Sequence, residues 1–175
     1  MNPFWRLFIS LGVAGGLALL GGGAGPGCAG LGQEKESKRH YTLALHPLAP
    51  AGEPDSALIQ TMPTDTGKTI RVRTAAFLTS TNITGAVFRS AQGKAPAALD
   101  LTLDAHGRFL WLQALGEVNG VPVAVFVDDW FRFVIRLPPP TGGDAPLTLE
   151  GAWTPDEGAG VAAQAGKNYK RLNGK

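Results

Sequence analysis

The stretch VAVFVDDWFRFVIR, residues 123–136, places two neighbouring carboxylates between two strongly apolar runs. In the first run the valines at alternate positions share one face, while Ala124 and Phe126 lie on the other. That pattern is typical of a central strand covered on both sides. In the second run apolar and polar residues alternate, which also indicates a strand. Two strands joined by two polar residues predict a β-hairpin with Asp128 and Asp129 in its turn.

The paired aspartates also raise the alternative of an acid/base or metal site. Adjacent residues at the end of a strand point to opposite sides, so Asp128 and Asp129 are badly arranged to act on one substrate. Aspartate also favours turns, because its carboxylate bonds to the nearby backbone. We therefore expect a structural turn, with an acidic or metal site as the alternative.

The second strand of this hairpin carries the candidate binding residues. Its alternation predicts two faces, with Phe131, Phe133, Ile135 and Leu137 on one and Trp130, Arg132, Val134 and Arg136 on the other. Aromatic and arginine side chains contribute most at protein interfaces, so Trp130, Arg132 and Arg136 are the candidate partner-binding residues. The alternative is that Trp130 packs beneath a helix while the arginines are solvated.

Periodicity along the rest of the chain predicts the other elements. Alternating apolar residues predict strands at 41–48, 69–74, 98–104 and 147–151. Helices are expected at 106–118, capped by Asp104, and at 154–165, capped by Thr154 and ended by Gly166. A short helix is expected within 78–88, and the loop-like segment 49–68 is expected to hold one helical turn at 56–60.

This order of elements indicates the fold class. Antiparallel hairpins mixed with helices predict an α+β fold, in which a mixed, mainly antiparallel sheet has two or three helices packed on one face. With 175 residues, of which 44% are hydrophobic and 17% charged, we expect one folded core.

Charge and motifs narrow the classes of function. The net charge is only +2, and the basic residues are scattered apart from 35–40 and 167–175, so we expect no nucleic-acid partner. The single cysteine offers no intrachain disulfide and no zinc cluster. His40, His46 and His106 have no paired spacing, and no GxSxG or HExxH motif is present, so we expect no catalytic residues, no metal and no cofactor. Hydrolase activity is a further hypothesis, which the absence of these motifs disfavours.

The N-terminal segment is typical of a secretion signal. Residues 1–27 combine Arg6 with an apolar stretch, and a retained membrane anchor is the alternative. Cys28 lies at the expected cleavage site, with Gly27 before it and Ala29 after it. This resembles a bacterial lipoprotein signal, in which the cysteine is acylated, although Gly25 and Pro26 depart from the usual lipobox. The alternative is an ordinary signal peptide that is cleaved nearby, with a cysteine that is not acylated.

The expected lipid anchor has consequences for location. Acyl chains on Cys28 would hold the protein at a membrane surface without a spanning helix. The resemblance to lipoproteins, with alanine after the cysteine, favours the periplasmic side of the outer membrane. Residues 28–40 would then be a polar tether, and 41–68 a strand followed by an irregular segment.

From residue 69 to residue 166 the order of motifs resembles the periplasmic head subdomain of SecD, a preprotein translocase subunit. The matching features are a strand ending at Asp104 before Gly107, VFVDD at 125–129, Leu137 with Pro138, the Gly142-Gly143 loop, Gly151, the WTPDEGAGVA helix at 153–162, and an upstream segment at 70–88. Asp129 stands where the family has a turn glycine, and Trp153 where it has phenylalanine. The chain shows no six-helix membrane domain, so we expect the soluble head alone, followed by a basic tail at 167–175.

Two functions are expected, of which the first follows from the resemblance to the SecD head. The first is a non-enzymatic, lipid-anchored envelope protein that binds exported proteins or a component of the Sec translocon. The second is an auxiliary lipoprotein of an envelope transporter, which binds lipid or a small apolar ligand between sheet and helices.

Overall fold

The computed structural model describes residues 39–64, 66–117, 122–142 and 145–174, which belong to one compact unit. The described elements, in chain order, are β1 (Leu43–Pro47), β2 (Ile59–Pro63), β3 (Thr69–Arg73), β4 (Leu78–Thr79), β5 (Ile83–Arg89), β6 (Ala98–Leu103), α1 (Ala105–Glu117), β7 (Pro122–Val127), β8 (Trp130–Arg136), β9 (Leu147–Glu150) and α2 (Pro155–Leu172). The described strands pair antiparallel. The fold is therefore α+β, as expected.

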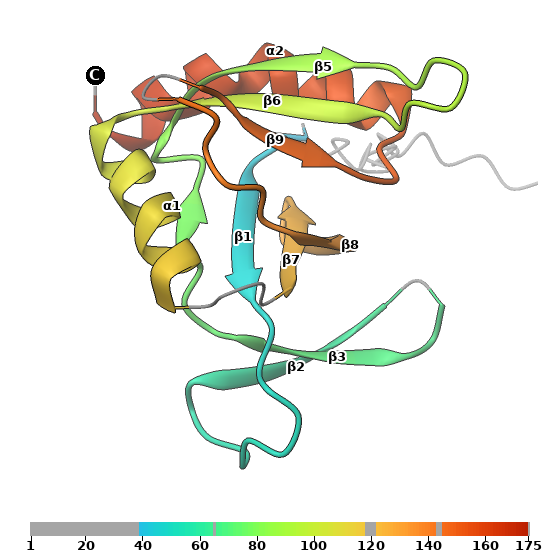
Figure 1. Cartoon of the computed structure of the whole chain (residues 1–175), viewed down its shortest axis with the longest axis vertical. Coiled ribbons are helices and arrows are strands. Elements are labelled where there is room, and N and C mark those ends of the chain that lie inside the picture. The colour runs from blue at the N-terminus through green and yellow to red at the C-terminus, as the bar shows by residue number, and fades with distance from the viewer. Residues whose placement is uncertain (1–38, 65, 118–121, 143–144, 175) are drawn as a thin grey trace, which may run out of the picture. The chain divides into compact units, whose positions relative to one another are not determined.

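The strands form three sheets, so the expectation of one sheet is wrong. One sheet has the order β4-β1-β7-β8, a second has the order β5-β6-β9, and β2 with β3 forms a separate hairpin (Figure 1). The reason lies in β7, which is apolar on both faces and needs a covering layer on each. The strand β1 pairs along the whole of its length with β7, so the segment 41–68 belongs to the same folding unit as the rest.

Two apolar clusters fill the spaces between these layers. The main core lies between the two larger sheets and contains buried leucines and valines from β1, β6, β7 and β9, with Trp111 of α1 and Val161 of α2. The second core lies on the opposite face of β7, where Ala124 and Phe126 pack against Val72 of the hairpin β2-β3. Both faces of β7 are therefore covered, which confirms its prediction as a central strand.

Two predicted helical segments are in fact strands. Residues 59–63 form β2 rather than a helical turn, and the segment 78–88 forms β4 and β5 rather than a short helix. The serines and threonines of 78–84 look like helix caps in the sequence. However, β-branched and aromatic residues follow, and β6 lies alongside, so strand pairing is favoured.

The helix α2 begins where expected but is longer than expected. The N–H of Glu157 bonds to the hydroxyl of Thr154 at 3.3 Å, and Pro155 occupies the first turn. Gly166 does not end the helix, which runs to Leu172, so most of the predicted basic tail is helical. A Cβ at Gly166 would lie 3.3 Å from the carbonyl oxygen of Thr84, so this glycine instead allows α2 to approach β5 closely.

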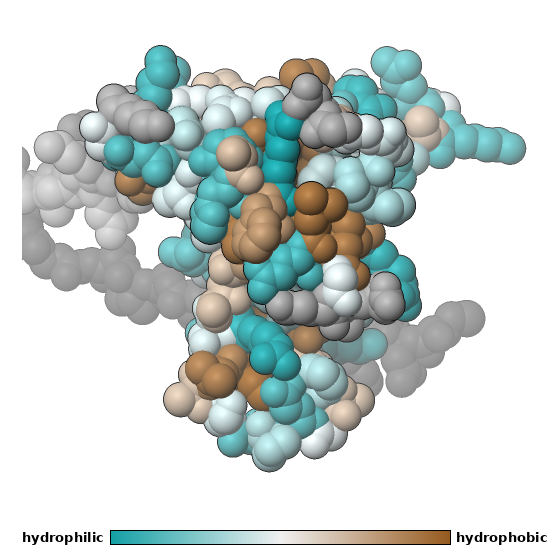
Figure 2. Space-filling model, turned by 60° about the vertical axis from the view of Figure 1, so that its left-hand side comes forward, coloured by the Kyte–Doolittle hydropathy of each residue, from teal (hydrophilic) through white to brown (hydrophobic). Residues whose placement is uncertain are grey.

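The cap predicted for α1 is confirmed, because the carboxylate of Asp104 accepts the N–H of Gly107 at 2.7 Å. The helix buries Trp111 but leaves Phe109 and Leu112 more than half exposed. This side of the molecule shows apolar surface beside polar surface (Figure 2). Neither described helix combines the length and the hydropathy needed to cross a bilayer.

Candidate functional site

The Asp128-Asp129 pair forms the turn between β7 and β8. Both residues adopt the left-handed conformation, with φ angles of 49° and 65°. Two successive positive φ angles are the signature of the type I′ turn, whose twist matches the twist of a hairpin. Aspartate tolerates this conformation better than most residues. The prediction of a turn is thus confirmed, despite the aspartate where glycine is usual.

The carboxylate of Asp128 binds the start of β1. It accepts the backbone N–H groups of Tyr41 at 3.0 Å and of Thr42 at 2.8 Å, and the hydroxyl of Thr42 at 3.0 Å. Burial alone would raise the pKa of Asp128, but these hydrogen bonds outweigh it and the pKa is lowered. Asp128 is therefore an ionised structural anchor, and it holds Tyr41, which has an unusual positive φ of 51°.

A β-bulge lies just beyond this turn. Val125 is opposite Phe133 and Phe126 is opposite Phe131, so Arg132 is an extra residue on β8. Phe131 consequently packs in the second core, whereas Phe133 packs against the main core. The prediction that both phenylalanines share one face is wrong, because the bulge reverses the alternation of β8.

The bulge also separates the predicted binding residues. Trp130 lies opposite Val127 and Arg136 lies opposite Pro122. Val127 and Pro122 point to opposite faces of β7, because they are an odd number of positions apart. The expectation that Trp130, Arg132 and Arg136 share one face is therefore wrong.

Arg132 turns toward α2 and forms an ion pair with Glu157 in the first turn of that helix. The carboxylate of Glu157 is nearly buried, and burial raises its pKa, although the charge of Arg132 opposes this shift. This pair connects the bulge to the helix. Arg132 is therefore a structural residue rather than a solvated one.

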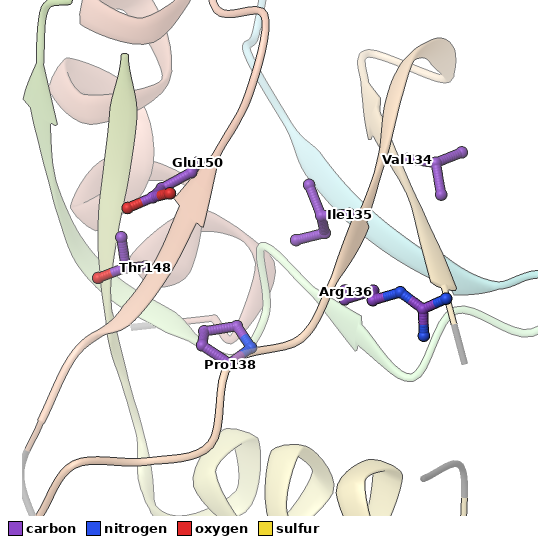
Figure 3. A pocket seen from close by; sticks show the side chains of 6 residues that line it. All are labelled: Val134, Ile135, Arg136, Pro138, Thr148 and Glu150. Carbon is purple, nitrogen blue, oxygen red and sulfur yellow. The ribbon is translucent and has the colours of Figure 1, made fainter. Parts of the chain in front are cut away.

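Trp130 is free of the core, with 69% of its surface exposed. The alternative that it packs beneath a helix is excluded by this exposure. At the other end of β8, Arg136 lines a pocket of about 370 Å³ between β8 and β9 (Figure 3). Its lining residues are Val134, Ile135, Arg136 and Pro138 from β8 and the segment after it, and Thr148 and Glu150 from β9. In Figure 3 Ile135 lies on the side of β8 nearer β9, whereas the side chains of Val134 and Arg136 extend away from β9.

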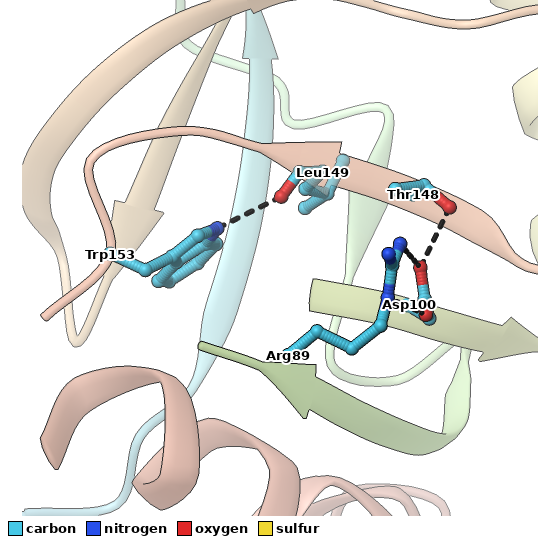
Figure 4. Close-up of polar contacts among 5 residues, drawn as sticks. All are labelled: Arg89, Asp100, Thr148, Leu149 and Trp153. Atoms are coloured by element: carbon cyan, nitrogen blue, oxygen red, sulfur yellow. Dashed lines mark hydrogen bonds and ion pairs between the residues drawn. The ribbon is translucent and has the colours of Figure 1, made fainter. Parts of the chain in front are cut away.

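The β9 wall of this pocket is fixed by polar contacts across the sheet. The hydroxyl of Thr148 donates to Asp100 of β6 at 2.7 Å, and Asp100 also receives two bonds from Arg89 of β5, at 2.7 and 2.9 Å (Figure 4). The Arg89 guanidinium holds the pKa of Asp100 below its ordinary value. One side chain from each strand therefore locks the register of the β5-β6-β9 sheet.

Aromatic packing then sets β8 against the segment that follows β9. The indole N–H of Trp153 donates to the carbonyl of Leu149 at 2.9 Å, and its ring meets Phe133 edge-on with centroids 5.0 Å apart. A Cβ at Gly151 would lie only 2.3 Å from the ring of Phe133, so glycine is required for this close approach. These contacts pack the segment after β9 against β8, next to the strands that carry the pocket residues.

The two strands that flank the pocket are both sheet edges. β8 ends the four-stranded sheet and β9 ends the three-stranded sheet. Among the described residues, no further strand pairs with the outer side of either. An edge strand presents a row of N–H and C=O groups that can pair with another chain. We name the exposed part of β8 from Trp130 to Arg136, with the adjoining pocket, the β8 edge site.

Sequence reasoning found part of this site. It named Trp130 and Arg136 but missed Val134, Thr148 and Glu150. The alternation in LTLE does place Thr148 and Glu150 on the outer face of a strand, but it does not show that this strand lies beside β8. Cys28, the predicted lipidation site, is outside the described residues.

The histidines, which are the other side chains that could bind a metal, lie apart from one another. His46 Nδ1 is 2.9 Å from the carbonyl oxygen of Arg73, and His106 is exposed on α1. The part of the chain that the structure describes holds no group of three or more histidine, cysteine, aspartate or glutamate side chains that could bind a metal.

Comparison with models of protein families finds none that matches this chain. No curated protein sequence matches it either.

Proposed function

We propose that this protein is a non-catalytic binding module that holds an extended segment of another polypeptide along the β8 edge site. The observation that carries the proposal is the open edge of β8, which lies between an exposed tryptophan and a pocket. Strand addition to such an edge uses the peptide backbone for affinity and side-chain pockets for selectivity.

The geometry of β8 suits this mode. From Phe133 to Arg136 the strand pairs regularly with β7, so the bulge at Arg132 does not disturb this part of the edge. A bound segment running along β8 would pass Trp130 at one end and the pocket beside Arg136 at the other. Tryptophan and arginine are the residue types that contribute most to protein interfaces.

Of the two aspartates that raised the alternative of an acidic site, Asp128 is bound to the start of β1. Asp104, which caps α1, and Asp100, which crosslinks three strands, also have structural partners. This supports a binding role over a catalytic one.

The sequence likeness to the SecD head suggests what the partner is. A subdomain of that kind belongs to the protein export machinery, so we propose that the bound segment is an exported chain or a component of the Sec translocon. The lipoprotein-like signal that precedes Cys28 supports a place in the bacterial envelope, with the domain facing the periplasm.

The test is hydrogen exchange of the full chain with and without a reduced, carboxymethylated polypeptide that cannot fold. We expect backbone amides of β8 to exchange more slowly when the unfolded polypeptide is present, because strand addition would engage them. Amides of the β2-β3 hairpin are the internal control and should be unchanged. Equal protection of both regions, or none in β8, would contradict the proposal.

A second candidate function is the binding of lipid or another small apolar ligand. It is favoured by a pocket of about 280 Å³ whose lining residues are Arg108, Trp111, Leu112, Pro140, Gly142 and Ala145. The space between sheet and helices, where such a ligand was expected, is instead filled by the main core. Quenching of tryptophan fluorescence by a spin-labelled fatty acid would favour this candidate if Leu112→Gln abolished it and Val87→Gln did not.

A further inference from the structure

A cluster of basic side chains lies where the described chain begins. Arg39 and His40 precede β1, and they meet Lys167 and Arg171 of α2 around a pocket of about 260 Å³. The remaining lining residues, Gln164 and Asn168, are uncharged. We call this group the α2 basic patch. None of its residues lines the β8 edge site, so its role is separate from strand addition at that site.

The patch is built by specific contacts rather than by chance proximity. Asn168 is buried, and its side-chain amide donates to the carbonyl of His40 at 2.8 Å. Arg171 bonds to the Asn168 side chain at 3.0 Å and lies 2.8 Å from His40 Nδ1. These contacts fix the segment before β1 against the last turns of α2, so cations from two distant parts of the chain are held together.

The charge of His40 acts on the carboxylate of Asp128, but Asp128 is already bound by the backbone of Tyr41 and Thr42. The other cations of the patch, Arg39, Lys167 and Arg171, form no ion pair with a described carboxylate. The charge of Arg39 does act on Glu157, whose pKa it lowers against the effect of burial, but Glu157 is already paired with Arg132. The patch therefore presents arginine and lysine side chains that no described carboxylate pairs with.

Favourable interaction with the helix macrodipole does not explain the whole cluster. That interaction falls off within the last turn of a helix. Lys167 lies more than one turn before the end of α2 at Leu172, and Arg39 is not part of the helix. A cluster of uncompensated cations from two elements instead matches an anionic partner.

We propose that the α2 basic patch binds the negatively charged headgroups of a membrane, and this inference rests on the proposed lipid anchor at Cys28. Charge complementarity is the first argument, because each lysine or arginine near an anionic bilayer strengthens its attraction by about fivefold. The second is the length of chain before the patch. The eleven residues from Cys28 to Arg39 reach at most about 40 Å when fully extended, so an anchor on Cys28 keeps the patch close to the bilayer.

The test measures the rate at which an amine-reactive ester labels each lysine. The full chain is reconstituted into phosphatidylcholine vesicles, with or without phosphatidylglycerol, and labelling is followed by mass spectrometry. We expect phosphatidylglycerol to slow labelling of Lys167 by about fivefold or more. Lys68 and Lys94, which are exposed in turns outside α2, are internal controls whose rates should not change. High salt should remove the protection of Lys167.

Matched variants separate the patch from net charge. Arg39→Gln with Arg171→Gln should abolish most of the protection of Lys167, whereas Lys68→Gln with Lys94→Gln removes the same charge and should preserve it. Equal labelling of Lys167 in both kinds of vesicle would overturn the proposal. Protection by inorganic phosphate in phosphatidylcholine vesicles, at the same level as by phosphatidylglycerol, would also overturn it, because the site would then bind a soluble anion.

Discussion

The carboxylate of Asp128 accepts the backbone N–H of Thr42 at 2.8 Å, although the two residues are 86 positions apart in the chain. This bond joins the β7-β8 turn to the first strand of the same sheet. The turn that looks like a candidate acidic site is thus a connection between β1 and the hairpin that carries the β8 edge site.

Asp128→Asn should lower the free energy of unfolding by about 1–3 kcal/mol, because an amide cannot accept the charge-assisted bonds from Tyr41 and Thr42 equally well. Asparagine also tolerates the left-handed conformation, so backbone strain is not added. Urea unfolding at neutral pH measures the change. Asp129→Asn is the control, since Asp129 is exposed, and it should leave stability nearly unchanged. Equal effects of the two substitutions would contradict the anchoring role.

The Asp100 contacts predict loss of stability in acid. The pKa of Asp100 is lowered in the folded state, chiefly by the hydrogen bond from Arg89, so the unfolded chain binds the proton more readily. Its stabilising contribution is therefore present above about pH 4 and is lost as the pH falls through the lowered pKa. Asp100→Asn should reduce the free energy of unfolding at pH 6 and have little effect near pH 2. The same loss at both pH values would show that the contribution is not electrostatic.

Two helical glycines predict opposite effects of the same substitution. Gly158→Ala should destabilise the protein by about 1–3 kcal/mol, because the added methyl would lie 2.3 Å from the ring of Phe88. Gly116→Ala in α1 is the matched control, since nothing lies within 4 Å of its Cβ. It should stabilise the protein by about 1 kcal/mol through helix propensity alone. Thermal unfolding compares the two, and stabilisation by both would refute the close packing of α2 against β5.

The pair of Arg132 and Glu157 predicts a pH-dependent defect. Arg132→Leu leaves the nearly buried carboxylate of Glu157 without its partner, so stability at pH 7 should fall by about 2 kcal/mol, less than for a fully buried pair. The raised pKa of Glu157 should rise further. At low pH the Glu157 side chain of the folded protein is protonated and no longer an unpaired charge. The loss in the free energy of unfolding should therefore shrink as the pH falls toward 4.

The double variant Arg132→Leu with Glu157→Gln is the control for that prediction. Removal of the charge should restore much of the lost stability and most of the pH dependence should disappear. A defect in the double variant as large as in Arg132→Leu alone would mean that packing, and not the ion pair, is responsible.

Local patterns in the sequence are sufficient to predict most elements. The alternation in residues 98–104 predicts β6, Asp104 predicts the start of α1, and the two aspartates predict the hairpin turn. These features depend on neighbours in the chain, which is why they can be read without the fold. The prediction of a short helix within 78–88 is wrong, because this segment pairs with β6 and the local sequence pattern does not reveal that partner.

The candidate site depends on long-range arrangement and was predicted only in part. Arg132 looks like a regular strand residue, and nothing in the alternation shows that it is inserted as a bulge. Thr148 and Glu150 become site residues only because two sheets place the edges of β8 and β9 on either side of one pocket. Gly166 is a similar case. The sequence predicts that this glycine ends the helix, but in the structure it allows α2 to pack closely against the backbone of Thr84.

The most direct test of the central claim is site-specific crosslinking in living cells that make the protein. A photoreactive residue replaces Trp130, and in separate strains Val87 or Leu58, which have comparable exposure of 62% and 65% on other surfaces. Binding along the β8 edge site predicts that position 130 captures exported chains or Sec subunits and that the two control positions do not. Capture of the same proteins at all three positions, or of lipid alone at position 130, would contradict it.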